Sequence, residues 1–183
     1  MDEPDGAARG GRADARRNRE RLLTAAKAAF AELGAGVSLE EIARRAGVGI
    51  ATLYRNFDSR EAMLEAVYRL DVESHSASAT KLLETMAPSD ALHEWMRRAL
   101  DYAATKRGMS SALASISDGS SELYAYSSRL YADASTLLVQ RATESGDIRE
   151  GVDPMELLGA LGGLRAASGV TTGRRARCGC SLF

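Results

Sequence analysis

The sequence has little cysteine and no long apolar run, and each scarcity excludes a class of protein. Its two cysteines, Cys178 and Cys180, lie near the C-terminus and cannot staple a fold, which fits a reducing compartment. No run of about 18 apolar residues occurs, so we expect no membrane-spanning segment. The charged N-terminus lacks the apolar stretch of a secretory signal, and the expected location is therefore the cytoplasm.

Patterns of metal ligands and catalytic groups are also missing. The two histidines, His75 and His93, have no second ligand at metal-binding spacing, and Cys178-x-Cys180 is too isolated for a tetrahedral site. The sequence contains no phosphate-binding loop, nucleophile elbow or metalloprotease motif. We therefore expect no enzyme activity, no cofactor and no metal.

Charge is unevenly distributed along the chain, although the net charge is only −1. Residues 9–60 hold 11 Lys/Arg and 6 Asp/Glu, whereas residues 61–170 hold 10 Lys/Arg and 16 Asp/Glu. A basic first third favours a polyanionic partner for that part, unless the difference is a chance fluctuation. Within it, Arg17 and Arg19 either support contact with phosphate or the minor groove, or make no contact.

The spacing of apolar residues predicts an all-α protein, with no strand-like alternation from about residue 60 to residue 168. Residues 1–14 are expected to form a disordered arm, and a helix is expected from Ala15 until Gly34 ends it. Its apolar face comprises Leu22, Ala26, Ala29, Phe30 and Leu33. Further helices are expected from about 61 to 83 and over 91–106, 109–116, 122–145 and 155–167.

Capping patterns mark the starts of two of these helices. Ser38 with Glu41 forms a capping box that starts a short helix, which Gly47 ends. Asp58 with Glu61 forms a second box at the start of the long fourth helix.

Residues 38–57 are typical of a helix-turn-helix: a capped helix, a glycine turn and a second short helix. The small Ala43 suits the close crossing of the two helices, and Gly47 suits the backbone angles of the turn. The apolar core is expected to comprise Ile42, Val48, Leu53 and Phe57, closed by Ala26, Phe30 and Leu33 of the first helix.

The side chains outside this core suit a DNA reader, in which early residues of the second helix meet base edges. Ile50 and Ala51 offer apolar contact to thymine methyl groups, although Ile50 equally well rests on Arg44. The polar candidates for phosphate or base contact are Thr52, Tyr54, Arg55, Asn56, Arg44, Arg45 and Arg60. Structural alternatives stay open: Tyr54 packs against the fourth helix, Thr52 caps or packs, and residues 44 and 45 form a solvated helix face.

Three specific motifs occur within residues 18–64: a first helix of the form AAxxxFxExG, the segment IARRAGV and the segment TLYRNFDSREAML. With them this part of the chain, about a quarter of its length, resembles the DNA-binding domain of the TetR family of bacterial transcriptional regulators. Arg60 stands where that family often has lysine. The resemblance implies a two-domain, all-helical homodimer that binds a palindromic operator, with a divergent C-terminal domain that holds a small-molecule inducer.

The resemblance also implies dimerisation through the last two helices, of which one is visible, near residues 153–168. Its candidate interface residues are Leu157, Leu161 and Leu164. Where the second helix is expected, residues 169–183 form an atypical tail rich in arginine, glycine and cysteine. The dimer geometry therefore stays open.

Candidate residues for an inducer pocket are the larger side chains of the C-terminal part. They are Trp95, Met96, Tyr102, Leu113 and Tyr126. Core packing is the commoner fate of residues at such spacing, and an aromatic content of 5% provides few stacking surfaces.

The sequence thus predicts four segments: an arm over 1–14, a helix-turn-helix domain over 15–60, a ligand-binding and dimerisation domain over 61–168, and the tail over 169–183. It predicts a homodimeric repressor that a small-molecule inducer releases from operator DNA. Two alternatives stay open, an activator or ligand-independent regulator and a helical small-molecule-binding protein or enzyme that binds no DNA.

Overall fold

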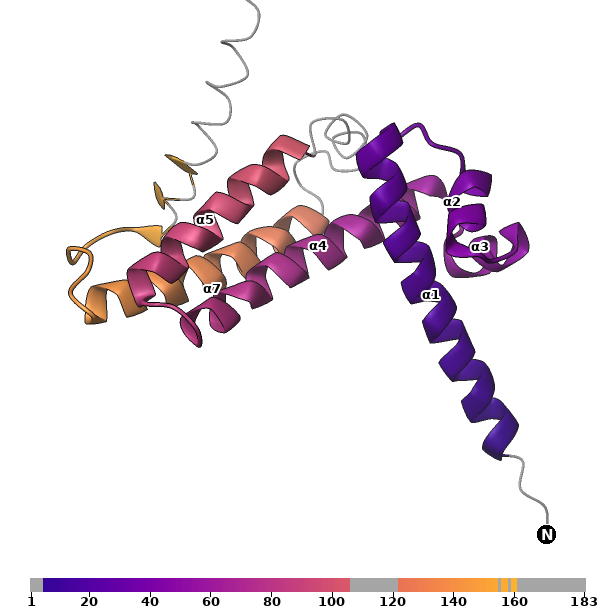
Figure 1. Ribbon diagram of the computed structural model, residues 1–183, viewed down its shortest axis with the longest axis horizontal. Coiled ribbons are helices and arrows are strands. Elements are labelled where there is room, and N and C mark those ends of the chain that lie inside the picture. Colours follow the sequence, from indigo (N-terminus) through magenta and orange to yellow (C-terminus); the bar gives the residue numbers. More distant parts are fainter. Residues whose placement is uncertain (1–4, 106–121, 155, 158, 161–183) are drawn as a thin grey trace, which may run out of the picture. The chain divides into compact units, whose positions relative to one another are not determined.

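A computed structural model describes residues 5–105, 122–154, 156–157 and 159–160, and within these ranges it contains helices and no strand. The side chains of residues 5–12, 102–105 and 124 lie outside this description. The helices, labelled in Figure 1, are α1 (Asp5–Leu33), α2 (Leu39–Ala46), α3 (Ile50–Asn56), α4 (Arg60–Leu83), α5 (Pro88–Thr105) and α7 (Glu122–Glu144). The predicted all-α fold is confirmed.

The chain divides into two compact units, which we describe separately. Unit 1 comprises residues 1–74 and 105–130, and unit 2 comprises residues 75–104 and 131–183. The helices α4 and α7 each contribute residues to both units. The expected helix over 109–116 and the tail over 169–183 lie outside the described residues, while residues 154, 156–157 and 159–160 are helical.

The core of unit 1 contains the four apolar residues that the helix-turn-helix pattern predicts. Ile42, Leu53 and Phe57 are buried, and Val48 packs against them half-buried. The α1 helix contributes Leu22, Ala26, Ala29 and Phe30, and α4 contributes Met63, Leu64 and Val67. The expectation for Leu33 is wrong, because this last residue of α1 is 56% exposed.

The turn between α2 and α3 begins with a left-handed glycine. Gly47 has φ 63° and ψ 38°, and its N–H donates to the carbonyl of Arg44 at 3.1 Å. The next N–H, of Val48, donates to the carbonyl of Ala43 at 3.0 Å. These two bonds satisfy carbonyls that the end of α2 would otherwise leave without partners, and they turn the chain toward α3.

The starts of two helices differ from the predicted capping boxes. Ser38 caps α2, with its Oγ accepting from the N–H of Glu41 at 3.1 Å, but the Glu41 carboxylate turns to arginines within its own helix. At α4 the cap is Ser59 and not Asp58, since the Ser59 Oγ accepts from the N–H of Ala62 at 3.0 Å. A one-residue shift of the helix start explains the difference.

Two further helices begin earlier than the sequence suggests. The expected disordered arm over 1–14 differs from the structure, in which α1 reaches back to Asp5. Adding residues to an existing helix avoids the cost of nucleation, so α1 continues through glycines that would not start a helix. The helix expected over 91–106 begins at Pro88, the first residue of α5, where a missing N–H costs nothing.

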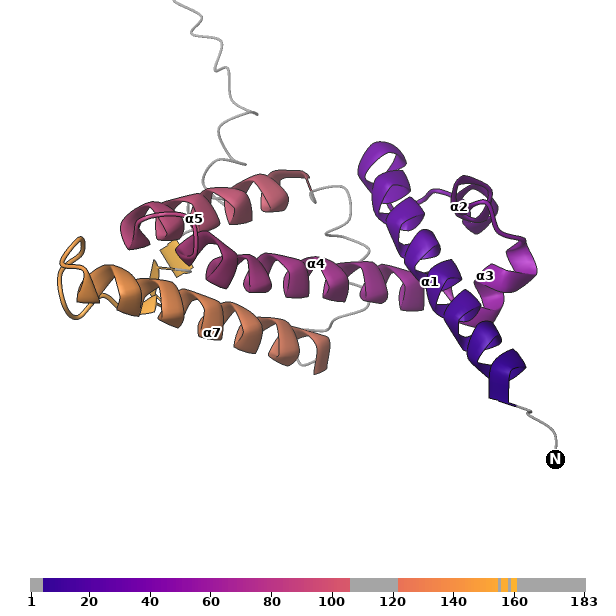
Figure 2. The same ribbon diagram turned by 60° about the horizontal axis from the view of Figure 1, so that its bottom comes forward.

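Unit 2 has its own core. There α5 and α7 lie beside the C-terminal part of α4 in both views (Figures 1 and 2). Trp95 of α5 and Leu138 of α7 are fully buried against Ala79 and Leu82 of α4. Among the described residues no helix is long and apolar enough to span a membrane.

The left-handed backbone at Gly47 predicts a cost for any side chain there. Gly47→Ala should lower the free energy of unfolding by about 1–2 kcal/mol, since an L-residue is strained at positive φ. Its Cβ would also lie 2.6 Å from Nη2 of Arg21. Urea denaturation measures the loss, and Gly36→Ala is the matched control because its Cβ meets nothing within 4 Å. Equal stabilities of the two variants would contradict this account of the turn.

Candidate nucleic-acid interface

The outward surface of α3 consists of side chains that have little contact with the rest of unit 1. Leu53 is the buried residue of this seven-residue helix. At 100° per residue, Ala51 and Arg55 lie on the opposite side of the helix, and both are exposed. Tyr54 is 50% exposed and Ile50, at the helix start, is 37% exposed. An apolar pair, a phenol and a guanidinium therefore share one accessible surface.

The remaining polar groups of α3 bond to one another. Nη2 of Arg55 donates to Oγ1 of Thr52 at 2.9 Å, and Nδ2 of Asn56 donates to the carbonyl of Thr52 at 2.8 Å. Thr52 and Asn56 are half-buried. These contacts hold the Arg55 guanidinium along the helix, and they leave Asn56 with less freedom to reach another partner than the sequence suggested.

Residues 44 and 45 of α2 are linked to acidic groups. The Glu41 carboxylate accepts from Arg44 at 2.7 and 2.8 Å and from Arg45 at 2.8 Å, and Arg45 also donates to Glu32 at 2.6 Å. Hydrogen bonds first from Arg44 and then from Arg45 lower the pKa of Glu41 from 4.5 to about 2. Glu41 therefore stays charged at neutral pH and offsets part of the positive charge expected to attract phosphate.

Arg60, the first residue of α4, has a structural role that the sequence did not indicate. Its Nη1 donates to the carbonyls of Ala35, at 2.9 Å, and Val37 in the loop between α1 and α2. These bonds attach the start of α4 to that loop. Any phosphate contact by Arg60 depends on its other N–H groups.

Two arginines of α1 contact the ends of α2 and α3. Nη2 of Arg21 donates to the carbonyl of Gly47 at 3.1 Å, and Nη1 of Arg19 donates to the carbonyl of Asn56 at 3.1 Å. Neither contact was predicted from the sequence. Local spacing gave no signal for these contacts, since they join residues 26 and 37 positions apart.

An open groove of about 660 Å³ lies along α1 beside the turn after α2. Its charged lining residues are Arg17, Arg21, Arg45 and Glu20. Arg17 pairs with Asp14 at 2.5 Å and Arg45 with Glu32 and Glu41, so part of this positive charge is already neutralised within the protein.

An ion pair links α1 to α4 within the same unit. Nζ of Lys27 lies 2.6 Å from Oδ1 of Asp71, whose side chain is 3% exposed. A nearly buried carboxylate depends on such a partner, because an unpaired charge away from water is costly.

Comparisons with known proteins agree with this geometry. A model for bacterial regulatory proteins of the tetR family matches residues 22–67, and one for the C-terminal domain of SbtR-like transcriptional regulators matches residues 87–178. A TetR transcriptional regulator from Streptomyces coelicolor is 41% identical in sequence over 82% of this chain and 86% of its own, with a TM-score of 0.71. The chain belongs to the TetR family.

Two further structures are similar over most of their length. A TetR transcription regulatory protein from Mycobacterium vanbaalenii is 33% identical over 90% of this chain and 99% of its own, with a TM-score of 0.72. A structure described as the molecular basis for control of antibiotic production by bacterial hormones is 29% identical over 82% and 84%, with a TM-score of 0.59. No curated protein gives a significant match. This TetR-family chain is therefore a transcriptional regulator with a helix-turn-helix that binds DNA.

The residues predicted to bind a ligand fall in different units of the TetR fold. Trp95 is fully buried in unit 2, with the half-buried Met96 packed against the same core. Tyr126 belongs to unit 1, where its hydroxyl donates to Oε1 of Glu73 at 2.8 Å. Leu113 and the side chain of Tyr102 lie outside the described residues.

The three predicted dimer-interface residues are only partly described. Leu157 is half-buried and packs against the core of unit 2, while Leu161 and Leu164 lie outside the described residues. The dimer interface therefore stays a prediction.

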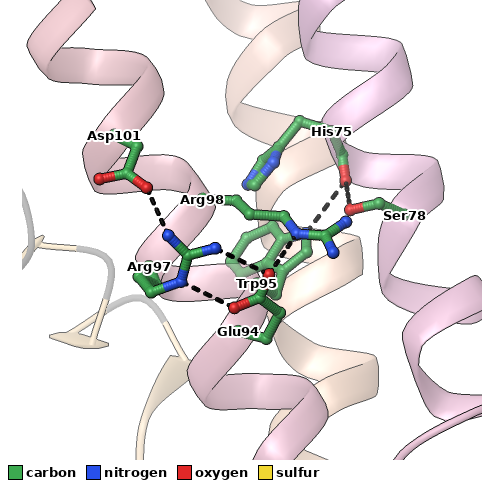
Figure 3. A network of polar contacts seen from close by, with 7 residues as sticks. All are labelled: His75, Ser78, Glu94, Trp95, Arg97, Arg98 and Asp101. Atoms are coloured by element: carbon green, nitrogen blue, oxygen red, sulfur yellow. Dashed lines mark hydrogen bonds and ion pairs between the residues drawn. The ribbon is translucent and has the colours of Figure 1, made fainter.

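Unit 2 also contains an aromatic cluster that was not predicted from the sequence. The ring of His75 stacks on Trp95 with centroids 4.7 Å apart, and Tyr131 lies 5.5 Å from His75 and 5.8 Å from Trp95. Nε1 of Trp95 donates to the His75 carbonyl at 3.1 Å, as does Oγ of Ser78 at 2.6 Å (Figure 3). Nε2 of His75 is buried, and no described residue forms a hydrogen bond with it.

Burial shifts the titration of this histidine. Desolvation and then the positive charge of Arg98 lower the pKa of His75 from 6.5 to about 4. Arg98 itself donates to Glu94 at 2.7 Å, and Arg97 bridges Glu94 and Asp101 in the same network (Figure 3). The imidazole is therefore neutral at pH 7.

This shift predicts how stability depends on pH. Between pH 6.5 and about 4 the unfolded chain binds a proton at His75 that the folded protein excludes, so the free energy of unfolding falls as the pH is lowered. His75→Phe keeps a ring against Trp95 and should flatten that slope in urea denaturation at pH 7 and pH 5. The control is His93→Phe, at an exposed position of α5. If both variants keep the wild-type slope, His75 is not the titrating group.

Proposed function

We propose that this protein is a repressor that binds a palindromic operator as a homodimer and leaves it when a small molecule binds the C-terminal domain. The observation that carries the DNA-binding part is the surface of α3, where Ile50, Ala51, Tyr54 and Arg55 are accessible above the buried Leu53. A helix fixed by one buried face, with its other face accessible, suits reading of the major groove.

Each residue of this surface has a separate proposed role. Ile50 and Ala51, at the start of α3, contact base edges, preferably thymine methyl groups. Tyr54 and Arg55 contact phosphate, which determines most of the affinity and its salt dependence. Arg44 is the better phosphate candidate of the α2 pair, because its side chain is 72% exposed and that of Arg45 is bonded to two carboxylates.

In this proposal the protein has the two domains expected from its sequence. They are a DNA-binding domain over 15–60 and a ligand-binding and dimerisation domain over 61–168. A homodimer places two recognition helices about 34 Å apart, one turn of DNA. We assign Leu157, Leu161 and Leu164 to the dimer interface. A ligand that binds one arrangement of the dimer more tightly shifts the population away from the DNA-bound form.

Two features support a small-molecule effector. Unit 2 contains the rings of His75, Trp95 and Tyr131 in mutual contact, together with a neutral imidazole whose Nε2 has no hydrogen-bond partner in the part of the chain that the structure describes. Aromatic rings and a hydrogen-bond acceptor are groups that commonly line small-molecule sites. In addition, one similar structure is described in terms of control by bacterial hormones.

The accessible surface of α3 predicts two different effects on DNA binding. Tyr54→Phe should weaken binding to all sequences by about 0.5–1.5 kcal/mol, since it removes one hydrogen bond to phosphate, and should leave the free energy of unfolding nearly unchanged. Ile50→Gln should instead change which duplex is preferred, by about 1–3 kcal/mol between competing sites. Fluorescence anisotropy on the duplex that the wild type enriches from a random library measures both.

The matched control is Leu33→Gln, which changes an exposed apolar residue of the same unit away from α3. It should bind all duplexes like the wild type. If Tyr54→Phe and Ile50→Gln also do so, the role of α3 in recognition is wrong. If the protein is a monomer by light scattering, the homodimer is wrong, and if deleting its gene lowers transcription of the target, the protein is an activator.

A further inference from the structure

The recognition helix has few restraints of its own. It contains seven residues, of which Leu53 is buried, and Gly49 at its start provides no side-chain cap. Helices this short are marginal in water, so contacts outside the helix must fix its orientation. Leu53 fixes one point of the helix, and outside it Phe57 is buried in the same core with Val48 packed against it.

A second restraint comes from α1. Nη1 of Arg19 donates to the carbonyl of Asn56, the last residue of α3, at 3.1 Å. The guanidinium carbon of Arg19 also lies 4.4 Å from the ring centre of Phe57, the residue that ends α3. A cation at this position satisfies a carbonyl without a helical partner and complements the negative end of the helix dipole.

The neighbouring helix is held in a similar way. Arg21, two residues further along α1, donates to the carbonyl of Gly47 just after α2. The end of α2 has two terminal backbone bonds, from the N–H groups of Gly47 and Val48, whereas the described C-terminal backbone bond of α3 is from Phe57 N–H to the Leu53 carbonyl. The end of α3 therefore depends more on its arginine than the end of α2 does.

We propose that Arg19 is a positioning residue for sequence reading: it fixes the tilt of α3 and does not act as a phosphate contact. This inference rests on the proposed role of α3 as the recognition helix. Without Arg19, the C-terminal end of α3 keeps the burial of Phe57 and one backbone bond, and its tilt is less restrained. Base-edge contacts need close alignment and suffer more from such a tilt than phosphate contacts, which carry no sequence information.

The test compares Arg19→Ala with Arg16→Ala in the full-length protein. Arg16 lies on the same helix, and its described contact is a 3.8 Å ion pair with Glu20 between exposed side chains, so the control removes the same charge. The probes are the duplex that the wild type enriches from a random library and a shuffled duplex of equal length, at several salt concentrations. The measured quantities are the ratio of the two affinities and the slope of log affinity against log salt.

Arg19→Ala should lower the affinity ratio about tenfold, because a charge-assisted hydrogen bond and a cation–π contact are both lost. Arg16→Ala should leave the ratio unchanged, and the two variants should have equal salt slopes. The inference is overturned if Arg19→Ala keeps the ratio. The inference is also overturned if the salt slope of Arg19→Ala is shallower than that of Arg16→Ala by about 0.9, because the loss of one phosphate contact changes the slope by about this amount.

Hydrogen exchange without DNA provides an independent test. Arg19→Ala should speed exchange at the amides of residues 53–57 and leave those of α2 unchanged, whereas faster exchange throughout unit 1 would mean general destabilisation and overturn the inference.

Arg19→Lys covers the case in which the alanine variant does not fold. It keeps the charge but not the planar group over Phe57, and it should lower the ratio about threefold; an unchanged ratio counts against the inference. If the wild type enriches no duplex, the proposed DNA function fails, while the exchange experiment still tests Arg19.

Discussion

The burial of Leu53 and Phe57 against α1 and α2 is the contact on which the DNA-binding unit depends. A seven-residue helix does not persist by itself, so α3 exists because this contact holds it. The same contact determines which residues remain accessible. Once Leu53 points inward, the 100° step of the helix places residues 51 and 55 outward and residues 52 and 54 on the flanks. The reading surface is thus a consequence of core packing.

Arginine has two roles in this unit, and the surplus of positive charge in the sequence does not separate them. Arg19, Arg21 and Arg60 each donate to backbone carbonyls at a helix end or in a loop. Arg44 and Arg45 share the Glu41 carboxylate. The positive balance over residues 9–60 therefore overstates the charge available for phosphate, because much of it already has a partner within the protein.

Patterns within one element or one turn could be predicted from the sequence, whereas contacts between distant elements could not. The Ser38 cap and the Gly47 turn depend on residues at most five positions apart, and both are confirmed. Hydrophobic periodicity likewise located the core, including Leu53 and Phe57. It failed at Leu33, where the helix ends and its face no longer meets a neighbour.

The candidate DNA-binding site likewise combines features that could be predicted from the sequence with contacts that could not. The helix over residues 50–56 could be predicted from the sequence because a helix-turn-helix assigns it by position, while its contacts with DNA stay a prediction. The bonds of Arg19, Arg21 and Arg60 were not found, because a guanidinium contacts any nearby carbonyl and leaves no pattern in residue types. The cluster of His75, Trp95 and Tyr131 was missed for a related reason, since its rings come from three helices.

In the proposed function, α4 is the element expected to connect ligand binding with DNA binding, since one continuous helix contributes residues to both units. Within unit 1, α4 contacts other elements at three positions along its length. Arg60 donates to loop carbonyls, Met63 and Leu64 pack in the core, and Asp71 forms an ion pair with Lys27 of α1. The ion pair between Asp71 and Lys27 is costly to break, because the Asp71 side chain is almost completely removed from water. A displacement of α4 is therefore expected to carry α1 with it. Because α1 also holds the ends of α2 and α3 through Arg21 and Arg19, such a displacement reaches the recognition helix through named bonds and needs no unfolding of unit 1.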